Sequence, residues 1–453
     1  MKIKLLLASA LFAINANQIS AQYLSTSVFP GATGVSNSGK VVGYNAFAGP
    51  IFFWNPEEKT VENIGGVAPG NGYGGVYVFS GDGNYISGSA FNGQGNGKLA
   101  EMSRYNVSTK TWQNLGSTGV ALDPNSLSSG YYISEDGKNV VGLSFNSNGN
   151  KKAIGFLWNE EKGPIELKSN NISKDARANA VSGDGAIIVG WQDIGGPWKS
   201  SVWKRNADGS YDANKMLLVN PNGSPTDYYN QLGEIRAISE NGKWLGGKSD
   251  PAFPAAWIWS EETGVINLGS LFPEPAYTSM VSAINNDGSI VLGFQMKQNG
   301  TSLPFIWTKT GGIKNLNDFV QNDLGFNLNG DKIAAPTMMS SNGKYIVGWS
   351  FPSINTDPNK SFRIQLPDSF LAAQNIAVKN DVKLYPNPVT EVLSIETKDK
   401  VESVKIYNGA GQLVNQSKVD ANKKINVTSL TTGVYNVNVT TDKGSQTYKV
   451  IKK

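Results

Sequence analysis

The stretch Ile133-Ser134-Glu135-Asp136-Gly137, followed by Val140-Val141-Gly142, decides the fold because variants of it recur seven times along the chain. Each copy has an apolar residue, a Ser or Asn, a variable residue, a polar residue that is usually Asp or Asn, and a Gly. A short apolar run follows, and in six copies it ends in a second Gly five residues after the first. The seven copies begin at Val35, Phe79, Ile133, Val181, Ile238, Ile284 and Met339.

The Asp-Gly or Asn-Gly step in most copies predicts a tight hairpin turn. These residue types tolerate positive φ, so we expect type I′ turns, whose twist suits a two-stranded hairpin. The run that follows, such as Val140-Val141, has little polar content, and we expect a strand buried on both faces. The closing Gly either ends this strand or lets a neighbouring backbone approach closely.

Two more strand patterns follow each hairpin. The third strand is aromatic, as in Ile51-Phe52-Phe53-Trp54 and Phe305-Ile306-Trp307, although Arg104 and Arg363 interrupt it in the second and last copies. A polar turn and a fourth short strand come next, as in Trp112-Gln113-Asn114-Leu115. Four strands in each of seven repeats, spaced by about 51 residues, predict an all-β fold with a seven-bladed β-propeller over residues 22–370.

The seventh repeat lacks an obvious fourth strand, whereas residues 23–29 form a spare strand-like run near the N-terminus. We expect this run to supply the missing strand and close the ring, because an open sheet edge is a template for aggregation. With their Phe-x-Trp strands and Ile-Ser-x-Asp-Gly hairpins, residues 24–367 resemble the HAF-type repeats of extracellular bacterial β-propellers. The resemblance implies the fold and an extracellular address, and it implies no settled activity.

The composition excludes several kinds of functional site. The 453 residues include no Cys and no His, which excludes disulfides, thiolate and imidazole metal ligands, and a Ser–His–Asp triad. The net charge of +4 is too small to indicate nucleic-acid binding. A calcium site needs about six oxygen ligands. Each Ser-x-Asp-Gly box clusters only two or three oxygens, which favours hairpin chemistry instead. We therefore expect no cofactor, no metal and no nucleic-acid partner.

The N-terminus has the pattern of an export signal. Lys2 and Lys4 precede a largely apolar run over residues 5–14, which is too short to span a membrane. Ile19-Ser20-Ala21 is a plausible cleavage site because Ala21 puts a small side chain at the scissile position. We expect a signal peptide over residues 1–21, cleavage between Ala21 and Gln22, and no transmembrane segment in the mature chain.

The composition changes after Phe370, beyond which the chain contains no Trp. Residues 371–380 are typical of a linker. From residue 381 onward three motifs stand out, namely Leu384-Tyr385-Pro386-Asn387-Pro388, Leu430-Thr431-Thr432-Gly433-Val434-Tyr435 and the terminal Lys452-Lys453. Alternating apolar residues in this region predict half-exposed antiparallel strands and a small Ig-like β-sandwich.

These three motifs resemble the type A C-terminal sorting domain of the type IX (Por) secretion system over residues 381–453. The resemblance implies a sorting signal made of Tyr385, Pro386, Asn387, Pro388, Leu430, Gly433, Tyr435, Lys452 and Lys453. It also implies the type IX machinery as a partner, with Sec export, folding in the periplasm and passage through the outer membrane. The product would be released, or attached to the outer surface of a Gram-negative bacterium. An ordinary appended Ig-like binding module is the alternative interpretation.

The connections of an up-and-down blade alternate between two faces. The connection between the second and third strands lies on the same face as the connection between blades, and both are long, variable and rich in Gly and aromatic residues. Such an arrangement favours recognition, and aromatic side chains suit sugar rings or protein hot spots. The candidate ligand-binding residues are Tyr73, Phe91, Trp191, Trp198, Tyr228, Tyr229, Phe253, Tyr277 and Phe351. For each of them, packing between loops or against a blade is the alternative.

Three function classes remain open. We favour a monomeric binding or adhesion module at the cell surface or in the medium, with an extracellular glycan or protein as ligand. A carboxylate-based polysaccharide hydrolase or lyase is the alternative, because such enzymes need no His, and a purely structural surface role is the third class. We predict no catalytic residue, because the repeat spacing brings no two carboxylates together. Asp193, Asp227 and Asp250 lie on the variable face, and nothing selects two of them.

Overall fold

The computed structural model describes residues 22–453 apart from twelve short gaps. The gaps are 71–73, 94–98, 119–125, 146–151, 194–197, 212–227, 252, 354–356, 376–381, 409–412, 418–422 and 442–443. The expected signal peptide, residues 1–21, lies outside the described residues. The described chain is almost entirely β-structure, as the sequence predicts.

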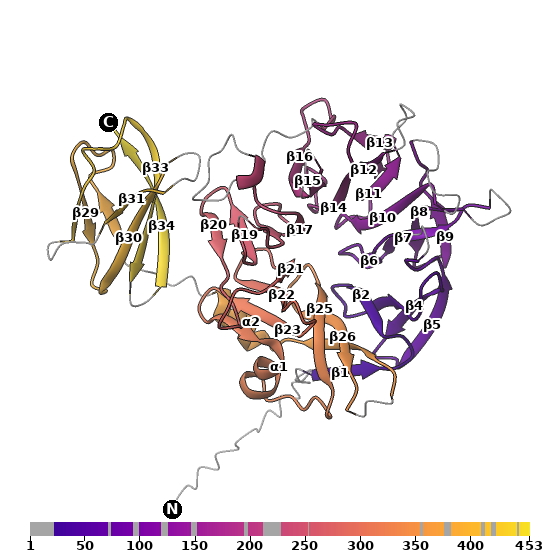
Figure 1. Ribbon diagram of the computed structural model, residues 1–453. Coiled ribbons are helices and arrows are strands. Elements are labelled where there is room, and N and C mark those ends of the chain that lie inside the picture. Colours follow the sequence, from indigo (N-terminus) through magenta and orange to yellow (C-terminus); the bar gives the residue numbers. More distant parts are fainter. Residues whose placement is uncertain are drawn as a thin grey trace, which may run out of the picture.

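Up to residue 365 the described strands form seven sheets, and Figure 1 shows them arranged around a common centre as a β-propeller. The first sheet contains β2 (Gly31–Val35), β3 (Val41–Tyr44), β4 (Ile51–Asn55) and β5 (Thr60–Gly65). The second contains β6 (Val78–Phe79), β7 (Tyr85–Phe91), β8 (Ala100–Asn106) and β9 (Thr111–Asn114). The third contains β10 (Ser128–Ile133), β11 (Asn139–Phe145), β12 (Ala153–Asn159) and β13 (Gly163–Leu167).

The remaining sheets follow the same order along the chain. The fourth contains β14 (Ala176–Val181), β15 (Ile187–Gln192) and β16 (Lys199–Lys204). The fifth contains β17 (Ile235–Ile238), β18 (Leu245–Gly247), β19 (Trp257–Ser260) and β20 (Gly264–Asn267). The sixth contains β21 (Thr278–Ile284), β22 (Ile290–Met296), β23 (Ser302–Thr308) and β24 (Gly312–Asn315). The seventh contains β25 (Lys332–Met339), β26 (Tyr345–Phe351), β27 (Lys360–Gln365) and β1 (Gln22–Thr26).

Four short helical segments accompany the sheets in the described part of the chain. They are η1 (Tyr228–Asn230), α1 (Leu316–Asp318), η2 (Phe319–Asp323) and α2 (Asp368–Asn375). Phe370 of α2 packs edge-on against Phe319, with 5.2 Å between the ring centres. The helix α2 therefore packs against the propeller, and it extends to Asn375, within the segment 371–380 that we expected to be a linker. No helix in the described part of the chain is long and apolar enough to span a bilayer.

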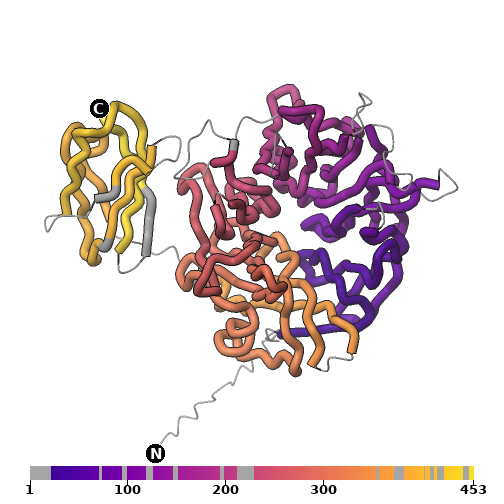
Figure 2. Tube along the Cα trace, viewed as in Figure 1, coloured from indigo at the N-terminus to yellow at the C-terminus, as the bar shows by residue number. Residues whose placement is uncertain are grey.

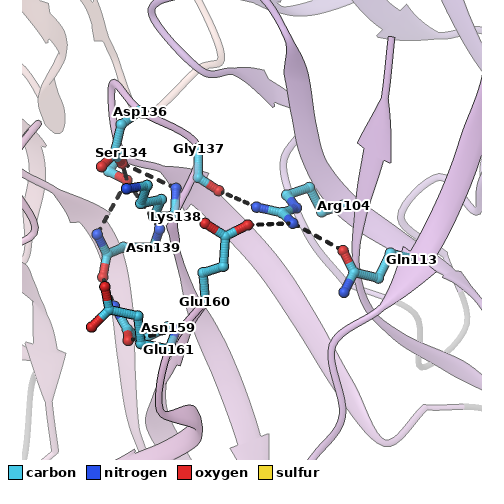
Figure 3. A network of polar contacts seen from close by, with 10 residues as sticks. All are labelled: Arg104, Gln113, Ser134, Asp136, Gly137, Lys138, Asn139, Asn159, Glu160 and Glu161. Carbon is cyan, nitrogen blue, oxygen red and sulfur yellow. Dashed lines mark hydrogen bonds and ion pairs between the residues drawn. The ribbon is translucent and has the colours of Figure 1, made fainter. Parts of the chain in front are cut away.

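Each Ser-x-Asp-Gly box closes the hairpin between the first and second strands of its sheet. In the third sheet, the Ser134 hydroxyl donates to Asp136 Oδ1 at 2.7 Å and accepts from the Asn139 amide at 3.0 Å (Figure 3). Asp136 Oδ1 also accepts from the Lys138 amide at 3.0 Å. The side-chain oxygens are thus used within the turn, which supports the hairpin interpretation of the box over the calcium interpretation.

The predicted type I′ turn is wrong. Positive φ is found at the Gly of the box, where Gly137 has a φ of 72°, and not at Asp136 before it. The Gly137 amide donates to the Ser134 carbonyl at 3.0 Å, so Glu135 and Asp136 are the central residues of the turn. The clasp between Ser134 and Asp136 holds Glu135 and Asp136 at negative φ, and the following Gly137 takes the left-handed conformation. The loop has four residues, because the Ser134 amide donates to the Asn139 carbonyl at 2.9 Å.

In five of the seven repeats the closing Gly lets the backbone of the inner strand approach closely, whereas Gly88 and Gly247 make room for the rings of Tyr77 and Trp257. A Cβ atom on Gly142 would lie 1.9 Å from the Ser129 carbonyl oxygen, and one on Gly190 would lie 1.9 Å from that of Arg177. The strand does not end there, since β11 continues to Phe145. The pairing of β10 with β11 shifts register between Gly130 and Tyr132, so the Gly lies beside a bulge in the inner strand.

The ring is closed by the N-terminal strand, as predicted. β1 pairs antiparallel with β27, with Gln22 opposite Gln365 and Thr26 opposite Ser361. Figure 2 shows the indigo start of the chain beside the orange strands of the seventh sheet. The buried Asp331 fixes this contact, because its carboxylate accepts from the hydroxyl of Tyr23 at 3.2 Å and from that of Ser25 at 3.1 Å.

The two Arg residues that interrupt the aromatic third strand connect neighbouring sheets. Arg104 of the second sheet donates to the Gly137 carbonyl of the third sheet at 2.7 Å and pairs with Glu160 at 3.2 Å (Figure 3). Arg363 of the seventh sheet repeats this contact with the Gly39 carbonyl of the first sheet at 3.1 Å. Both side chains are buried, so each replaces an apolar contact between sheets with a charged one.

The C-terminal strands form two further sheets. One contains β28 (Lys383–Tyr385), β29 (Val392–Glu396) and β32 (Lys424–Asn426). The other contains β30 (Val401–Tyr407), β31 (Leu413–Ser417), β33 (Gly433–Thr441) and β34 (Gly444–Lys452). Buried and half-buried residues alternate along most of β33, and Leu393, Val404 and Val437 contribute to a single apolar core. The predicted half-exposed strands are therefore present.

Replacing Gly137 by Ala should destabilise the propeller more than replacing Gly163 by Ala. Both glycines have a φ near 71–72°, so both variants carry the left-handed cost of about 1–2 kcal/mol. A Cβ on Gly137 would also lie 2.5 Å from Cδ2 of Tyr85, whereas one on Gly163 meets nothing within 4 Å. We expect a further loss of about 1–3 kcal/mol at position 137. Thermal melts of the two variants measure the difference. Equal losses of stability would contradict the close packing of Gly137 against the Tyr85 ring.

Removing β1 should destabilise the protein more than removing the C-terminal sheets. Two forms of the mature chain, one beginning at Gln22 and one at Gly31, differ by the strand that pairs with β27. We expect the shorter form to melt at a lower temperature and to aggregate, because it leaves the outer edge of β27 unpaired. Equal melting temperatures and equal solubility would show that closure contributes nothing to stability.

Candidate functional site

The antiparallel register assigns the connections of the propeller to two faces. In the fourth sheet, Ala176 at the start of β14 lies opposite Gln192 at the end of β15. The connections between sheets and those between second and third strands therefore share one face, which we call the variable face. The Ser-x-Asp-Gly turns lie on the other face, which we call the hairpin face. This assignment is the one predicted from the repeat.

The large apolar side chains that the propeller exposes lie on the variable face. Within its described residues they are Val28, Phe47, Phe91, Ile172, Trp198, Tyr229, Tyr277 and Phe351, and their exposed fractions range from 42% to 79%. All eight belong to a connection between sheets, to a connection between second and third strands, or to the strand residue next to one. The described part of the hairpin face has no exposed side chain of this kind.

Two of the predicted ligand-binding residues form a stacked pair. The indole rings of Trp191 and Trp198 lie parallel within 11°, with 4.0 Å between their centres. Trp191 is 5% exposed and Trp198 is 47% exposed. The guanidinium of Arg177 lies 5.6 Å from the Trp191 ring and 4.5 Å from the Tyr131 ring. Trp191 is thus a buried support that fixes the exposed ring of Trp198.

The other predicted residues divide between exposed and packed positions. Phe91, Tyr229, Tyr277 and Phe351 are exposed at four different sheets or connections, and Phe351 contacts Trp349 with 5.2 Å between ring centres. Phe253 is half-buried and packs against the core of the fifth sheet, as the packing alternative predicts. Tyr73 and the side chain of Tyr228 lie outside the described residues.

An axial cavity of about 240 Å³ lies among the inner strands of the sheets. Its polar lining includes Arg177, Asn179 and Arg236. All three donate to Glu234 Oε1, at 2.9 Å from Arg177, 2.9 Å from Asn179 and 3.2 Å from Arg236. One buried carboxylate thus balances two guanidinium groups, which leaves this part of the cavity with a net positive charge.

Of the three aspartates that the sequence placed on the variable face, the two described ones each form an ion pair with a lysine. Asp250 is buried in an ion pair with Lys199, with 2.8 Å between the charged atoms. Asp193 pairs with Lys174 at 3.9 Å, and Asp227 lies outside the described residues. The described contacts make both Asp250 and Asp193 partners of lysines in the scaffold.

A pair of carboxyl groups on the hairpin face was not predicted from the sequence. Glu135 and Glu240 occupy the variable middle position of the third and fifth boxes, and their side chains lie within hydrogen-bonding reach of each other. Burial of Glu240 and the negative charge of Glu135 raise the pKa of Glu240 to about 7, although a hydrogen bond with Ser341 opposes the rise. The repeat register could have revealed this pair, because equivalent positions of all repeats converge around the axis of a propeller.

The space beside this carboxyl pair is too small for a sugar ring. Glu240 and Ser341 line a cavity of about 20 Å³, which is enough for one water molecule. The catalytic carboxyls of glycosidases stand about 5–9.5 Å apart to admit the substrate between them. A pair that hydrogen-bonds directly inside so small a cavity does not have that geometry.

The C-terminal motifs that the sequence singled out are joined by backbone hydrogen bonds. The amide side chain of Asn387 donates to the Lys449 carbonyl at 2.8 Å and accepts from the Ile451 amide at 2.9 Å. The Tyr-Pro-Asn-Pro segment is thereby joined to the basic terminal strand β34. Tyr435 is buried, and its hydroxyl donates to the Thr431 carbonyl at 2.8 Å, which ties down the Leu-x-x-Gly-x-Tyr turn.

The sequence and fold of the chain resemble known proteins in two ways. Residues 383–453 match the family described as a secretion system C-terminal sorting domain, the Por secretion tail. The chain therefore carries a type IX sorting tail, which implies secretion or attachment to the cell surface in Bacteroidetes and interaction with the type IX machinery. The chain has no significant match among curated proteins.

Several solved structures resemble this chain at low identity. Oligogalacturonate lyase from Vibrio parahaemolyticus is 11% identical with a TM-score of 0.48, over 78% of this chain and 98% of that one. The β-propeller domain of the trilobed protease from Pyrococcus furiosus is 12% identical with a TM-score of 0.46, over 74% and 95%. TolB from Acinetobacter baumannii is 11% identical with a TM-score of 0.35, over 70% of this chain and 59% of that one. At these values the likenesses carry no inference about ligand or activity.

Proposed function

We propose that this protein is an exported propeller that binds an extracellular ligand through its variable face. The observation that carries the proposal is the one-sided distribution of exposed apolar side chains, eight of which lie on that face within the described residues. Exposed apolar groups gathered on one face are typical of interaction sites. Because the hairpin face offers short turns and no such side chains among its described residues, the two faces have different roles.

The geometry around Trp198 favours a glycan as the ligand class. A sugar ring presents an apolar face that stacks on an indole, and the gain is larger when the indole does not need to be ordered on binding. Trp191 stacks beneath Trp198 at 4.0 Å and keeps the exposed ring in place. A protein ligand would use the same exposed aromatics as contact points, and it is the second class to test.

The architecture that we propose extends the fold described above. The seven sheets would be the blades of a seven-bladed ring made of HAF-type repeats over residues 22–370, followed by a linker over 371–380. Residues 381–453 would be an Ig-like sorting domain of type A, and residues 1–21 a signal peptide removed before Gln22. The seven equivalent hairpins and the pairing of β1 with β27 support the ring, and the matched tail supports the export route.

A polysaccharide hydrolase or lyase is the second candidate, and the described carboxylates do not favour it. Asp193 and Asp250 form ion pairs with lysines. The pair of Glu135 and Glu240 lies on the hairpin face, away from the exposed aromatics, beside a cavity of about 20 Å³. Release of reducing ends from a bound polysaccharide would replace the binding proposal with this one.

Binding should depend on Trp198 and not on the hairpin face. On an array of bacterial and plant polysaccharides, we expect the mature chain to retain a ligand that Trp198→Ala binds at least about tenfold more weakly, a loss of about 1.4 kcal/mol. Trp198→Phe should retain most of the affinity because it keeps a stacking ring. Lys138→Ala, on the exposed hairpin face, is the matched control. A ligand lost in Lys138→Ala and kept in Trp198→Ala would contradict the assignment of the face.

Export should depend on the C-terminal sheets. Deleting residues 381–453 in the native host should leave a folded propeller in the periplasm, because the sorting tail directs passage through the outer membrane. Immunoblots of periplasm, outer membrane and medium measure the distribution, with the full chain as control. Normal amounts of the shortened protein in the medium would contradict the role of the tail.

A further inference from the structure

The middle residues of the seven boxes make contacts between different repeats on the hairpin face. Asn37 Nδ2 of the first repeat donates to Glu135 Oε1 of the third at 3.3 Å, and Asn37 Oδ1 accepts from the Asn342 amide of the seventh at 2.8 Å. Asn286 Oδ1 of the sixth accepts from the Asn241 amide of the fifth at 2.9 Å. In chain order the seven middle residues are Asn37, Gly81, Glu135, Gly183, Glu240, Asn286 and Ser341.

The two glycines among these residues make room for the two glutamates. A Cβ atom on Gly81 would lie 1.8 Å from Glu135 Oε2, and one on Gly183 would lie 1.8 Å from Glu240 Oε1. Neither Gly81 nor Gly183 has positive φ, so the turn itself does not require glycine at these positions. Glycine in the second and fourth repeats instead provides the space that the carboxyl groups of the third and fifth repeats occupy.

Each of the two carboxyl groups has a buried oxygen atom for which no hydrogen-bond donor among the described residues lies within reach. In the described part of the chain, Glu135 Oε2 and Glu240 Oε1 are buried oxygens without a hydrogen-bond partner. Two ionised carboxylates are both acceptors, so a hydrogen bond between them requires a proton on one of the two. A single proton would provide the missing donor and remove the repulsion between the two charges.

We propose that Glu240 keeps its carboxyl proton near neutral pH, donates it in a hydrogen bond to Glu135, and thereby latches the hairpin face of the propeller. The latch connects the third and fifth repeats directly. Through Asn37 and Ser341 it also reaches the first and seventh repeats, the two that meet where the ring closes. Loss of the proton leaves two like charges in contact, and their repulsion loosens the packing between the turns of the hairpin face. The proposal is independent of the ligand on the variable face.

The groups that surround Glu240 favour the protonated form. Asp184 of the fourth repeat adds a second negative charge, and Tyr132 lines the same cavity as a neutral phenol whose pKa is raised by burial. Arg236 also lines this cavity, but its guanidinium pairs with Glu234 at 3.2 Å. Since burial and Glu135 raise the pKa of Glu240 in the folded protein from 4.5 to about 7, the folded protein holds the proton more tightly than the unfolded chain does.

The sign of the stability change follows from this difference in proton binding. The stabilisation is fully present below about pH 4.5 and is lost as the pH rises through about 7. Other carboxylates, which usually ionise more readily when folded, act in the opposite direction. The contribution of the pair is therefore read from the difference between the wild-type chain and a variant that lacks only this titration.

Thermal melts of the mature chain and its Glu240→Gln variant, from about pH 5 to about pH 8.5, test the latch. Glutamine has the shape of a protonated glutamate and keeps a donor at every pH. We expect the melting temperature of the wild-type chain relative to the variant to fall by roughly 2–5 °C over this range. Glu135→Gln should weaken the same trend, because it removes the repelling charge and leaves burial, the larger cause of the raised pKa of Glu240, in place. A difference between wild type and Glu240→Gln that does not vary with pH would overturn the proposal.

Gly183→Ala tests the geometry without changing any charge. The added Cβ takes the place of Glu240 Oε1 and pushes the carboxyl group from its seat, so the pH-dependent difference should shrink to less than half. Gly163→Ala is the control for the pH-dependent difference: its Cβ meets no neighbour, and the strain from its positive φ does not vary with pH. Infrared difference spectra should contain a protonated carboxyl band near neutral pH that Glu240→Gln removes. A melting temperature that rises with added calcium at high pH, without such a band, would assign the pair to a cation and overturn the proton latch.

Discussion

The inner hairpins depend on one hydrogen bond, in which the Ser hydroxyl of the box donates to the polar side chain two positions later. This clasp measures 2.5–2.8 Å in the second, third, fourth, fifth and seventh repeats. In the sixth repeat Asn285 takes the place of Ser, and its Oδ1 accepts from the Ile290 amide at 2.9 Å. This second bond of the box, which the Asn139 amide also donates to Ser134 at 3.0 Å, therefore survives a change of residue. Because it fixes where the second strand begins, it also fixes which residues face the neighbouring sheet.

The hairpin boxes also provide the contacts between sheets. Arg104 and Arg363 reach the carbonyl of the box Gly in the next sheet, at 2.7 Å and 3.1 Å. The Gly183 amide donates to the Glu240 carbonyl at 2.8 Å, which joins the fourth and fifth boxes. One short sequence pattern thus shapes each sheet and joins it to the next. The connections of the variable face also join sheets, as where the Ser249 amide donates to the Ser279 carbonyl at 2.7 Å, but they do so without a shared sequence pattern.

Much of the fold could be predicted from the sequence because it rests on local periodic signals. The position of the turns, the two faces and the pairing of β1 with β27 follow from apolar runs, Gly spacing and the missing strand of the last repeat. The turn type could not be predicted from Asp-Gly alone, because the Ser134 clasp at 2.7 Å decides the conformation. Glu135 and Glu240 were missed because their contact depends on the convergence of repeats separated by about a hundred residues. In the candidate site, sequence placed Trp191 and Trp198 on one face, but only the side-chain geometry shows that one ring supports the other.

The strand that closes the ring has a consequence for the order of events during synthesis. β1 is among the first segments to be made, yet its partner β27 ends at Gln365, so the pairing joins residues more than three hundred positions apart. Contacts of such separation form late and slowly, because the chain between them must be ordered first. The Tyr23 and Ser25 hydroxyls can reach Asp331 only after that residue has also emerged. Until then the backbone of β1 is unpaired, and its hydrogen-bonding groups are open to pairing with a strand of another molecule. Preventing such pairing requires a chaperone or another protein that covers β1.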